Sequence, residues 1–283
     1  MTQHLSPIIS VQELLALKQT TDIVLIDASA GPDSKEKYTQ HHLVGALYVD
    51  LNVDLADIKE NASQGGRHPL PSVTAFAKTL AALGITPSSH VIIYDDKNSS
   101  NAAARFWWML SSIGHQKVQV LDGGFQAALK LGFETSSKIE IPLTTGLYPA
   151  TDWKLPMSTI NEVDAVRLNK EHLIIDVRDR IRYDGIKEPI DLIAGHIPGA
   201  INIPFSTNLD ADGFYLTPEV LKEKYTVALN NKDRGYVIVH CGSGVTACHT
   251  LLAMAYAGLE IPKLYVGSWS EWSRNEKPIG KNL

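Results

Sequence analysis

The feature that most constrains this 283-residue chain is an internal repeat. Four short motifs of the first half recur in the same order, at similar offsets, in the second half. The matched pairs are Val24–Asp27 with Ile174–Asp176, His42–Ala46 with His196–Ala200, Val91–Asp95 with Val237–Cys241, and Val120–Phe125 with Leu264–Trp269. One such match arises easily by chance, but four collinear matches indicate a duplicated domain.

Each half alternates short apolar strands with helical patterns, which is typical of a parallel sheet covered by helices. We therefore predict an α/β protein of two tandem domains, each a mainly parallel sheet flanked by helices. The helices predicted from the apolar periodicity are Val11–Lys18, Val73–Leu83, Asn101–Ser112, Phe125–Leu131, Thr159–Asn169, Pro218–Leu229, Val245–Gly258 and Trp269–Arg274.

The joint between the two domains is predicted where prolines interrupt any periodicity. Pro142, Pro149 and Pro156 fall between the last pattern of the first half and the first pattern of the second. We accordingly predict an N-terminal domain over residues 1–138, a connector over 139–157 and a C-terminal domain over 158–283.

Composition excludes several classes of protein. A formal charge of −5 and a pI near 6.0 argue against nucleic acid as a partner. No apolar run approaches the roughly 20 residues that span a bilayer, and the N-terminal residues lack the pattern of a secretory signal. The chain has two cysteines, too few for a disulfide framework. We expect a protein of a reducing compartment, the cytoplasm, without membrane attachment and as a monomer.

Cys241 is the strongest candidate for a reactive group. It follows the apolar strand pattern Val237–His240 and precedes a Gly-Ser-Gly turn that leads into a helix. Unpaired amides and the dipole at a helix N-terminus stabilise a thiolate relative to a thiol. Gly242 and Gly244 allow the backbone to curl so that several amides converge on one point. The sequence therefore predicts that Cys241 is a nucleophile.

The repeat makes a second statement about function. Asp95 stands in the first half where Cys241 stands in the second. Because a carboxylate cannot perform thiolate chemistry, we predict that the N-terminal domain is catalytically silent.

Three further motifs accompany the cysteine loop, namely Asp176–Arg178, Gly195–Ala200 and Gly267–Trp272. With them, the chain resembles the two-domain sulfurtransferases of the rhodanese family over nearly its full length. The resemblance implies a cysteine that takes sulfane sulfur from a small-molecule donor, becomes a persulfide, and passes the sulfur to a thiophilic acceptor. Cyanide and thiols such as thioredoxin are the acceptors that it implies. It implies no cofactor and no metal.

The loop sequence separates two branches of that family. Gly242-Ser243-Gly244 resembles the mercaptopyruvate sulfurtransferases, whereas thiosulfate sulfurtransferases of the animal type carry basic residues directly after the cysteine. A neutral loop lacks cationic help for a dianionic donor, and Ser243 can hydrogen-bond a donor's carbonyl or sulfur. The resemblance therefore implies 3-mercaptopyruvate as the donor and Ser243 as a catalytic residue, with thiosulfate as the alternative.

The resemblance also assigns the residues that bind the donor. Arg182 matches the family arginine that holds the donor's anionic group, for which a guanidinium fork is suited. His68 falls where the mercaptopyruvate branch has a histidine, and the amides of the loop residues hold the persulfide. The loop residues assigned to binding are Gly242, Gly244, Val245 and Thr246.

Two positions depart from the mercaptopyruvate pattern. The animal enzymes carry a second arginine several residues after the first, but here the run is Lys187–Asp191. The aspartate assigned to the serine–aspartate relay of the mercaptopyruvate enzymes aligns best with Asn52, and Asp54 is a nearby substitute. Both departures bear on donor preference and leave the persulfide chemistry of Cys241 unaffected.

Zinc is disfavoured as an explanation of the cysteines. His240 and Cys241 form one adjacent pair, and Cys248 and His249 form another. Neighbouring side chains on a strand or helix point in different directions, whereas structural zinc needs four convergent ligands. Cys248 lies at the spacing of an apolar helix face and is interpreted as a core residue.

Two other functions compete with sulfur transfer as explanations of Cys241. A cysteine phosphatase requires an arginine six positions after the cysteine to neutralise the phosphoryl group. In this chain that position is Ala247, so the sequence argues against a phosphatase. A non-catalytic sulfur-sensing or binding module predicts loss of the cysteine, which has happened only in the first half; this module is kept as the alternative to an enzyme. Sulfur uptake from a donor separates that module from an enzyme.

Overall fold

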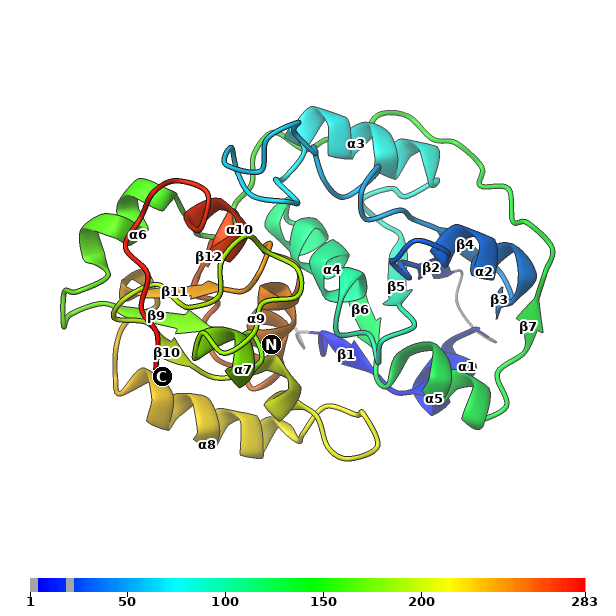
Figure 1. Cartoon of the computed structure of the whole chain (residues 1–283). Coiled ribbons are helices and arrows are strands. Elements are labelled where there is room, and N and C mark those ends of the chain that lie inside the picture. Colours follow the sequence, from blue (N-terminus) through cyan, green and yellow to red (C-terminus); the bar gives the residue numbers. More distant parts are fainter. Residues whose placement is uncertain (1–4, 19–22, 283) are drawn as a thin grey trace. The chain divides into compact units, whose positions relative to one another are not determined.

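The computed structural model describes residues 5–18 and 23–282, which divide into two compact units (Figure 1). The first unit contains the described residues of Met1–Leu55, Pro71–Lys154 and Ala211–Phe214, and the second contains those of Ala56–Leu70, Leu155–Asp210 and Tyr215–Leu283. The change of unit after Lys154 falls within the predicted connector. The exchanged segments 56–70 and 211–214 were not foreseen, and the functional division into domains stays a prediction.

The first unit is built on a five-stranded sheet in the order β1-β6-β5-β2-β4, with all neighbours parallel. A small antiparallel pair, β3 with β7, lies outside it. The strands are β1 Ile8–Ile9, β2 Ile23–Asp27, β3 His42–Leu43, β4 Ala46–Tyr48, β5 His90–Tyr94, β6 Val118–Leu121 and β7 Thr135–Ser136. The helices are α1 Val11–Lys18, α2 Ser34–Gln40, α3 Val73–Ala82, α4 Ala102–Ser112 and α5 Gly124–Lys130.

The second unit repeats this arrangement. Its sheet has the order β8-β12-β11-β9-β10, again with parallel neighbours. The strands are β8 Met157–Ser158, β9 Leu173–Asp176, β10 Ile201–Asn202, β11 Val237–His240 and β12 Lys263–Tyr265. The helices are α6 Ile160–Val166, α7 Arg180–Tyr183, α8 Pro218–Leu229, α9 Thr246–Tyr256 and α10 Ser268–Trp272, with 3-10 turns at Phe205–Asn208 and Arg234–Tyr236. The equivalent strand orders confirm the predicted fold class and the duplication.

Every predicted helix is present, with ends that differ by a few residues from the predicted ones. Two short helices were missed. Helix α2 has the polar sequence SKEKYTQ and α7 has four residues, so neither shows an apolar period. Local caps set several helix starts: Ser72, Thr159 and Thr217 each accept a hydrogen bond from the amide three residues later.

The two missed helices explain why the histidine motif is repeated. Tyr38 of α2 stacks on His42 with ring centroids 4.0 Å apart, and Tyr183 of α7 stacks on His196 at 3.9 Å. Each tyrosine hydroxyl donates a hydrogen bond to the carbonyl of the alanine that ends its motif. Each histidine Nδ1 lies within hydrogen-bond distance of its tyrosine's own carbonyl oxygen. The motif is therefore a structural lock that joins a short helix to an edge strand in both units.

The core of each unit lies against its sheet. The β-branched and aliphatic residues of β5 and β11 are buried, as expected for central strands of parallel sheets. In the second unit, Trp269 and Trp272 of α10 are fully buried and pack in the same cluster as Ile174, Ile238 and Tyr265.

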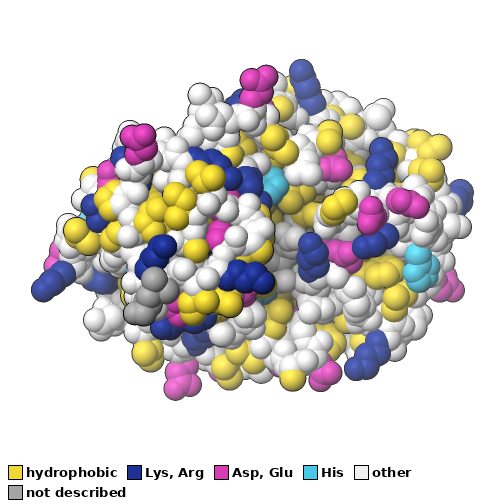
Figure 2. All heavy atoms as spheres, in the orientation of Figure 1, with side chains coloured by type: hydrophobic (Ala, Val, Ile, Leu, Met, Phe, Trp, Pro, Cys, Tyr) yellow, Lys and Arg dark blue, Asp and Glu magenta, His cyan; other side chains and the backbone are white. Residues whose placement is uncertain are grey.

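No helix in the described ranges is long and apolar enough to cross a bilayer. On the face shown in Figure 2, basic and acidic side chains are interspersed. The expectation that no secretory signal is present rests in part on residues 1–4, which lie outside the described residues.

Candidate active site

Cys241 lies where the sequence predicts, between the end of β11 and the start of α9. The residue is buried, with 1% of its surface exposed. The beginning of α10 holds its main chain: the Cys241 amide donates to Ser268 Oγ at 3.2 Å, and its carbonyl accepts from the Trp269 amide at 3.0 Å. The Gly242 carbonyl accepts from the Ser270 amide at 2.8 Å. The loop is thus fixed by main-chain bonds on one side.

The amides that follow the cysteine have no acceptor in the described part of the chain. This holds for Gly242, Ser243, Val245 and Thr246, none of which donates a hydrogen bond there. Gly244 has φ +73°, and a Cβ on it would lie 2.4 Å from the Val266 carbonyl oxygen, so only glycine fits the curl. Buried donors without an acceptor are costly unless a ligand or a charged group uses them. Such a set can hold an anionic sulfur.

The first unit shows the same loop with its donors occupied. The Phe125 amide donates to the Asp95 carbonyl at 3.1 Å, which reproduces the bond between Trp269 and Cys241. The Asp95 carboxylate accepts from the amides of Lys97 at 2.8 Å, Asn101 at 2.9 Å and Ala103 at 3.1 Å. The carboxylate therefore serves as the internal ligand of its own loop.

His68 and Ser243 are brought together. His68 Nδ1 lies 2.8 Å from Ser243 Oγ. The segment that carries His68 packs within the second unit, where the Gly65 amide donates to Glu271 at 2.9 Å and the Arg67 amide donates to Ser270 Oγ at 3.0 Å. The predicted boundaries had placed this segment in the N-terminal domain.

Arg182, on α7, also reaches the cysteine loop. A Cβ on Gly242 would lie 3.3 Å from Arg182 Nη2. The same nitrogen pairs with Glu188 at 2.8 Å and with Asp191 at 3.2 Å, and both carboxylates are almost fully buried. Burial raises the pKa of Glu188, but the bonds from Arg182 and from the Asp191 amide outweigh this and hold that pKa below its usual range. The guanidinium is thereby held in place beside the loop.

Arg67 is the residue that the sequence analysis missed. Its Nη2 would lie 3.0 Å from a Cβ on Gly242, and its Nε pairs with Asp191 at 2.9 Å. Arg274 is a third partner of the Asp191 carboxylate, at 3.2 Å. The signal was present in Gly66-Arg-His-Pro, where an arginine directly precedes the assigned histidine. The Asp191 carboxylate lies at the same point, with Oδ2 3.4 Å from that Cβ. Residues 242–244 carry no charge, and the guanidinium groups beside them come from other segments of the same unit, each paired with a buried carboxylate.

A buried ion pair between Asp176 and Arg178 supports the site. Arg178 Nη2 lies 2.6 Å from the Asp176 carboxylate, and both side chains are fully buried. The guanidinium also donates to the Gly195 carbonyl at 2.6 Å and lies 4.6 Å from the Trp269 ring. Burial raises the pKa of Asp176, but the charge of Arg178 outweighs it and holds that pKa below its usual range.

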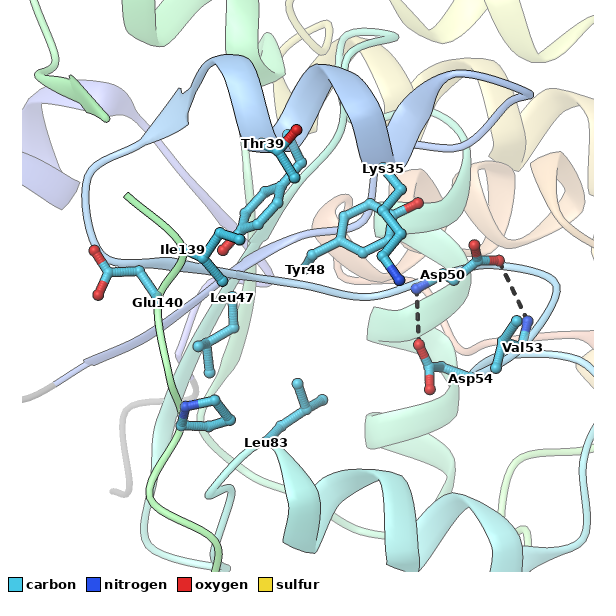
Figure 3. Close-up of a pocket in the computed structure, with 12 residues that line it drawn as sticks. Lys35, Thr39, Leu47, Tyr48, Asp50, Val53, Asp54, Leu83, Ile139 and Glu140 are labelled. Carbon is cyan, nitrogen blue, oxygen red and sulfur yellow. Dashed lines mark hydrogen bonds between the residues drawn. The ribbon is translucent and has the colours of Figure 1, made fainter. Parts of the chain in front are cut away.

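Asp54, the substitute considered for the relay aspartate, lies in the first unit. Its carboxylate accepts the Asp50 amide at 2.8 Å and lines a cavity of about 350 Å³ (Figure 3). Burial raises its pKa. Tyr48 and Leu83 also line this cavity, and no cysteine or histidine is among its lining residues. The relay role of Asp54 or Asn52 stays a prediction.

Cys248 occupies the core position predicted for it. It is fully buried in α9, with Sγ 3.3 Å from the Gly244 carbonyl oxygen. Both cysteines are free thiols. Within residues 5–18 and 23–282, no group of three or more histidine, cysteine, aspartate or glutamate side chains could hold a metal ion.

Comparison with known proteins agrees with this geometry. The family described as Rhodanese-like domain matches residues 10–130 and again residues 159–275. The chain belongs to this family. The two matched ranges coincide with the two copies of the repeat.

Relatives and solved structures extend over nearly the whole chain. A Pseudomonas aeruginosa protein named "Probable 3-mercaptopyruvate sulfurtransferase" is 36% identical, with 94% of each chain covered. Thiosulfate sulfurtransferase of Bos taurus is 34% identical over 87% of this chain and 82% of its own length. The structure of 3-mercaptopyruvate sulfurtransferase from Leishmania major superposes with a TM-score of 0.83 at 27% identity, covering 96% of this chain and 76% of that one.

Ser268 generates a first prediction. It has φ +55° where the repeat has Gly124 at +60°, and its buried hydroxyl accepts the Cys241 amide and donates to the Tyr265 carbonyl. We expect Ser268→Ala and Ser268→Gly to lose sulfur transfer to a similar degree, because both release the Cys241 amide. Ser268→Gly should unfold at a higher temperature than Ser268→Ala, because the left-handed backbone costs a non-glycine residue about 1 kcal/mol. Melting temperatures and kcat/KM of both variants check this. A clearly higher kcat/KM for the more stable Ser268→Gly than for Ser268→Ala would contradict it.

Asp95 generates a second prediction. Burial raises its pKa to about 6 despite the three amides that it accepts. Because the folded pKa is the higher one, its stabilising contribution is present at acidic pH and is lost as pH rises through 6. Relative to Asp95→Asn, the wild-type free energy of unfolding should therefore fall by roughly 2 kcal/mol between pH 4 and 6.5. Urea unfolding of both proteins across that range measures it, and parallel pH profiles would refute it.

Proposed function

We propose that this chain is a sulfurtransferase that takes sulfane sulfur from 3-mercaptopyruvate onto Cys241 and passes it to a thiophilic acceptor. One observation carries the proposal: main-chain donors that find no acceptor among the described residues follow a buried cysteine at a helix N-terminus. The names of the relatives, which include 3-mercaptopyruvate and thiosulfate sulfurtransferases, support the reaction class.

The first half-reaction follows from the placement of the side chains. Arg182 and Arg67 hold the donor's carboxylate, and Cys241 attacks the donor sulfur as a thiolate. The new S–S bond forms as the donor's C–S bond breaks, and its electron pair leaves on the enolate of pyruvate, which takes a proton. The amides of the loop residues from Gly242 to Thr246, which include those of Ser243, Gly244 and Val245, hold the terminal sulfur of the persulfide.

Ser243 and His68 act on the donor's carbonyl. Their 2.8 Å contact places a hydroxyl and an imidazole together beside the loop. A hydrogen bond from this pair to the carbonyl oxygen withdraws charge as the enolate develops, which lowers the barrier to C–S cleavage.

In the second half-reaction, a thiol or cyanide attacks the terminal sulfur and restores the Cys241 thiolate, which gives ping-pong kinetics. A protein thiol such as thioredoxin suits this role. A reducing compartment such as the cytoplasm would keep Cys241 reduced between turnovers. The first unit remains silent because Asp95 replaces the cysteine and occupies its own donor set.

Thiosulfate is the second candidate donor, and the arginines favour including it. Two guanidinium groups, those of Arg67 and Arg182, approach Gly242 from outside the loop. A dianion can use both, so a loop without basic residues does not exclude this donor.

The persulfide itself gives the third prediction. Incubation with 3-mercaptopyruvate should raise the intact mass of the wild-type protein by one sulfur atom, and cyanide should remove that increment. Cys241→Ser should gain no sulfur and show no turnover, whereas Cys248→Ser should gain it normally because Cys248 is a core residue. A wild-type protein that gained sulfur from neither donor would favour the non-catalytic binding module.

The arginines give the fourth prediction. Arg67→Gln and Arg182→Gln should each raise the donor's KM by roughly tenfold or more, because each removes a charge-assisted bond worth about 1.5–3 kcal/mol. Arg274→Gln is the matched control, since it also removes a partner of Asp191. Its KM should stay near that of the wild type.

Steady-state kinetics with both donors, together with melting temperatures, make the measurement. The increase in KM of Arg67→Gln and Arg182→Gln should be greater for thiosulfate, which carries two charges, than for mercaptopyruvate. An equal effect of all three substitutions would instead assign Arg67 and Arg182 to structural support of Asp191.

A further inference from the structure

The first unit contains a second cavity that the sulfur-transfer reaction does not use. It has a volume of about 230 Å³ and lies beside the end of β2 and the loop after β5. Its walls come from β2, α2, the loop after β5 and α5. The lining residues are Asp27, Ser29, Ser34, Lys37, Tyr38, His41, Asp96, Phe125 and Gln126. In parallel α/β sheets, the carboxyl ends of the strands are the usual place for a ligand.

The repeat identifies what fills the equivalent space in the second unit. Asp27 corresponds to Asp176, and Phe125 corresponds to Trp269. Between those counterparts lies the guanidinium of Arg178, which is 2.6 Å from the Asp176 carboxylate and 4.6 Å from the Trp269 ring. The second unit therefore shows an occupied guanidinium site built from a carboxylate and an aromatic face.

In the first unit, the carboxylate and the ring remain but the guanidinium is missing. The position of Arg178 is taken by Ser29, whose side chain is too short to fill the space. The local backbone is otherwise the same: the Ser29 amide donates to Asp27 Oδ1 at 2.8 Å, as the Arg178 amide donates to Asp176 Oδ1 at 3.0 Å. The cavity occupies the place where an arginine side chain lies in the other copy.

The aspartate beside this cavity and its counterpart in the second unit differ in pKa, as expected if only the second has a cation beside it. Burial, together with the nearby charge of Asp96, raises the pKa of Asp27, whereas the pKa of Asp176 is held low by Arg178. Asp96 Oδ1 is a buried acceptor with no donor in the described part of the chain. The carboxyl groups of Asp27 and Asp96 line the cavity with one ammonium, that of Lys37. His41 also lines it, with its ring at right angles to that of Phe125 and 5.5 Å from it. A bound guanidinium would give the lining a second fixed positive charge to match its two carboxyl groups.

We propose that this cavity binds a guanidinium group brought by a ligand, which pairs with Asp27 and lies on the ring of Phe125. The ligand is either a small guanidinium compound or an arginine side chain of a peptide. The inference does not depend on the sulfur-transfer reaction, because every residue that carries it belongs to the first unit.

Titration calorimetry on the full-length protein tests the site with three probes. Methylguanidinium and the tripeptide Gly-Arg-Gly carry the proposed group, and methylurea has a similar shape without the charge. We expect methylguanidinium to bind at least tenfold more tightly than methylurea. Tighter binding of the tripeptide would identify an arginine side chain as the ligand, and tighter binding of methylguanidinium would identify a small molecule.

Three substitutions locate the binding. Asp27→Asn should weaken methylguanidinium at least tenfold, and Phe125→Leu should weaken it several-fold through loss of the aromatic face. Ser29→Arg should abolish binding by supplying an internal guanidinium, and it should raise the melting temperature as it rebuilds the pair of the second unit. Trp269→Leu, at the equivalent position of that unit, should leave binding unchanged. The proposal is overturned if methylguanidinium binds no better than methylurea, or if it binds Asp27→Asn and Phe125→Leu as it binds the wild type.

Discussion

A set of main-chain donors at the turn between β11 and α9 sets the requirements that the rest of the second unit meets. Four amides that follow Cys241 lack an acceptor within the described chain, and the loop that carries them is almost fully buried. Left without a ligand, such donors oppose folding by about 1–3 kcal/mol each. Their geometry must therefore be imposed by surrounding structure. An anion that enters the loop, in particular the terminal sulfur of a persulfide, then accepts the hydrogen bonds that these amides do not make in its absence.

The surrounding structure supplies that constraint in two layers. Ser268, in a left-handed conformation, accepts the Cys241 amide, and the next residues of α10 donate to the loop carbonyls. Behind them, the buried pair of Asp176 and Arg178 fixes Trp269 through the guanidinium that lies on its ring. Strain and buried charge of this kind are retained at functional sites because the remaining packing holds them in place. The first unit has neither the strained residue nor the buried arginine, since glycine stands at the position of Ser268 and serine at that of Arg178.

The fold and the nucleophile could be predicted because their signals are local. The apolar run before Cys241 and the glycines after it are consecutive residues, and each of the four motifs of the duplication is a short run of the sequence. Helices α2 and α7 could not be predicted, because a polar heptapeptide and a single turn carry no apolar period. The role of Arg67 was hidden for another reason. It depends on the packing of residues 56–70 within the second unit, a tertiary choice that hydrophobic pattern alone does not encode. The contact of His68 with Ser243 was anticipated only through family resemblance.

Duplication also shows how one site can acquire two chemistries. In both copies a strand ends in a buried aspartate, and the last residue of the fourth motif is an aromatic residue in the first turn of a helix. In the second copy, the aspartate holds an arginine of its own chain and braces a cysteine loop. In the first copy, the Asp95 carboxylate accepts the amides of its own loop, and serine stands at the position of the arginine. The first copy therefore keeps the carboxylate and the aromatic ring, with a cavity beside them. Because a buried carboxylate without a cation is unfavourable, the difference of one residue between the copies favours an external guanidinium in the first.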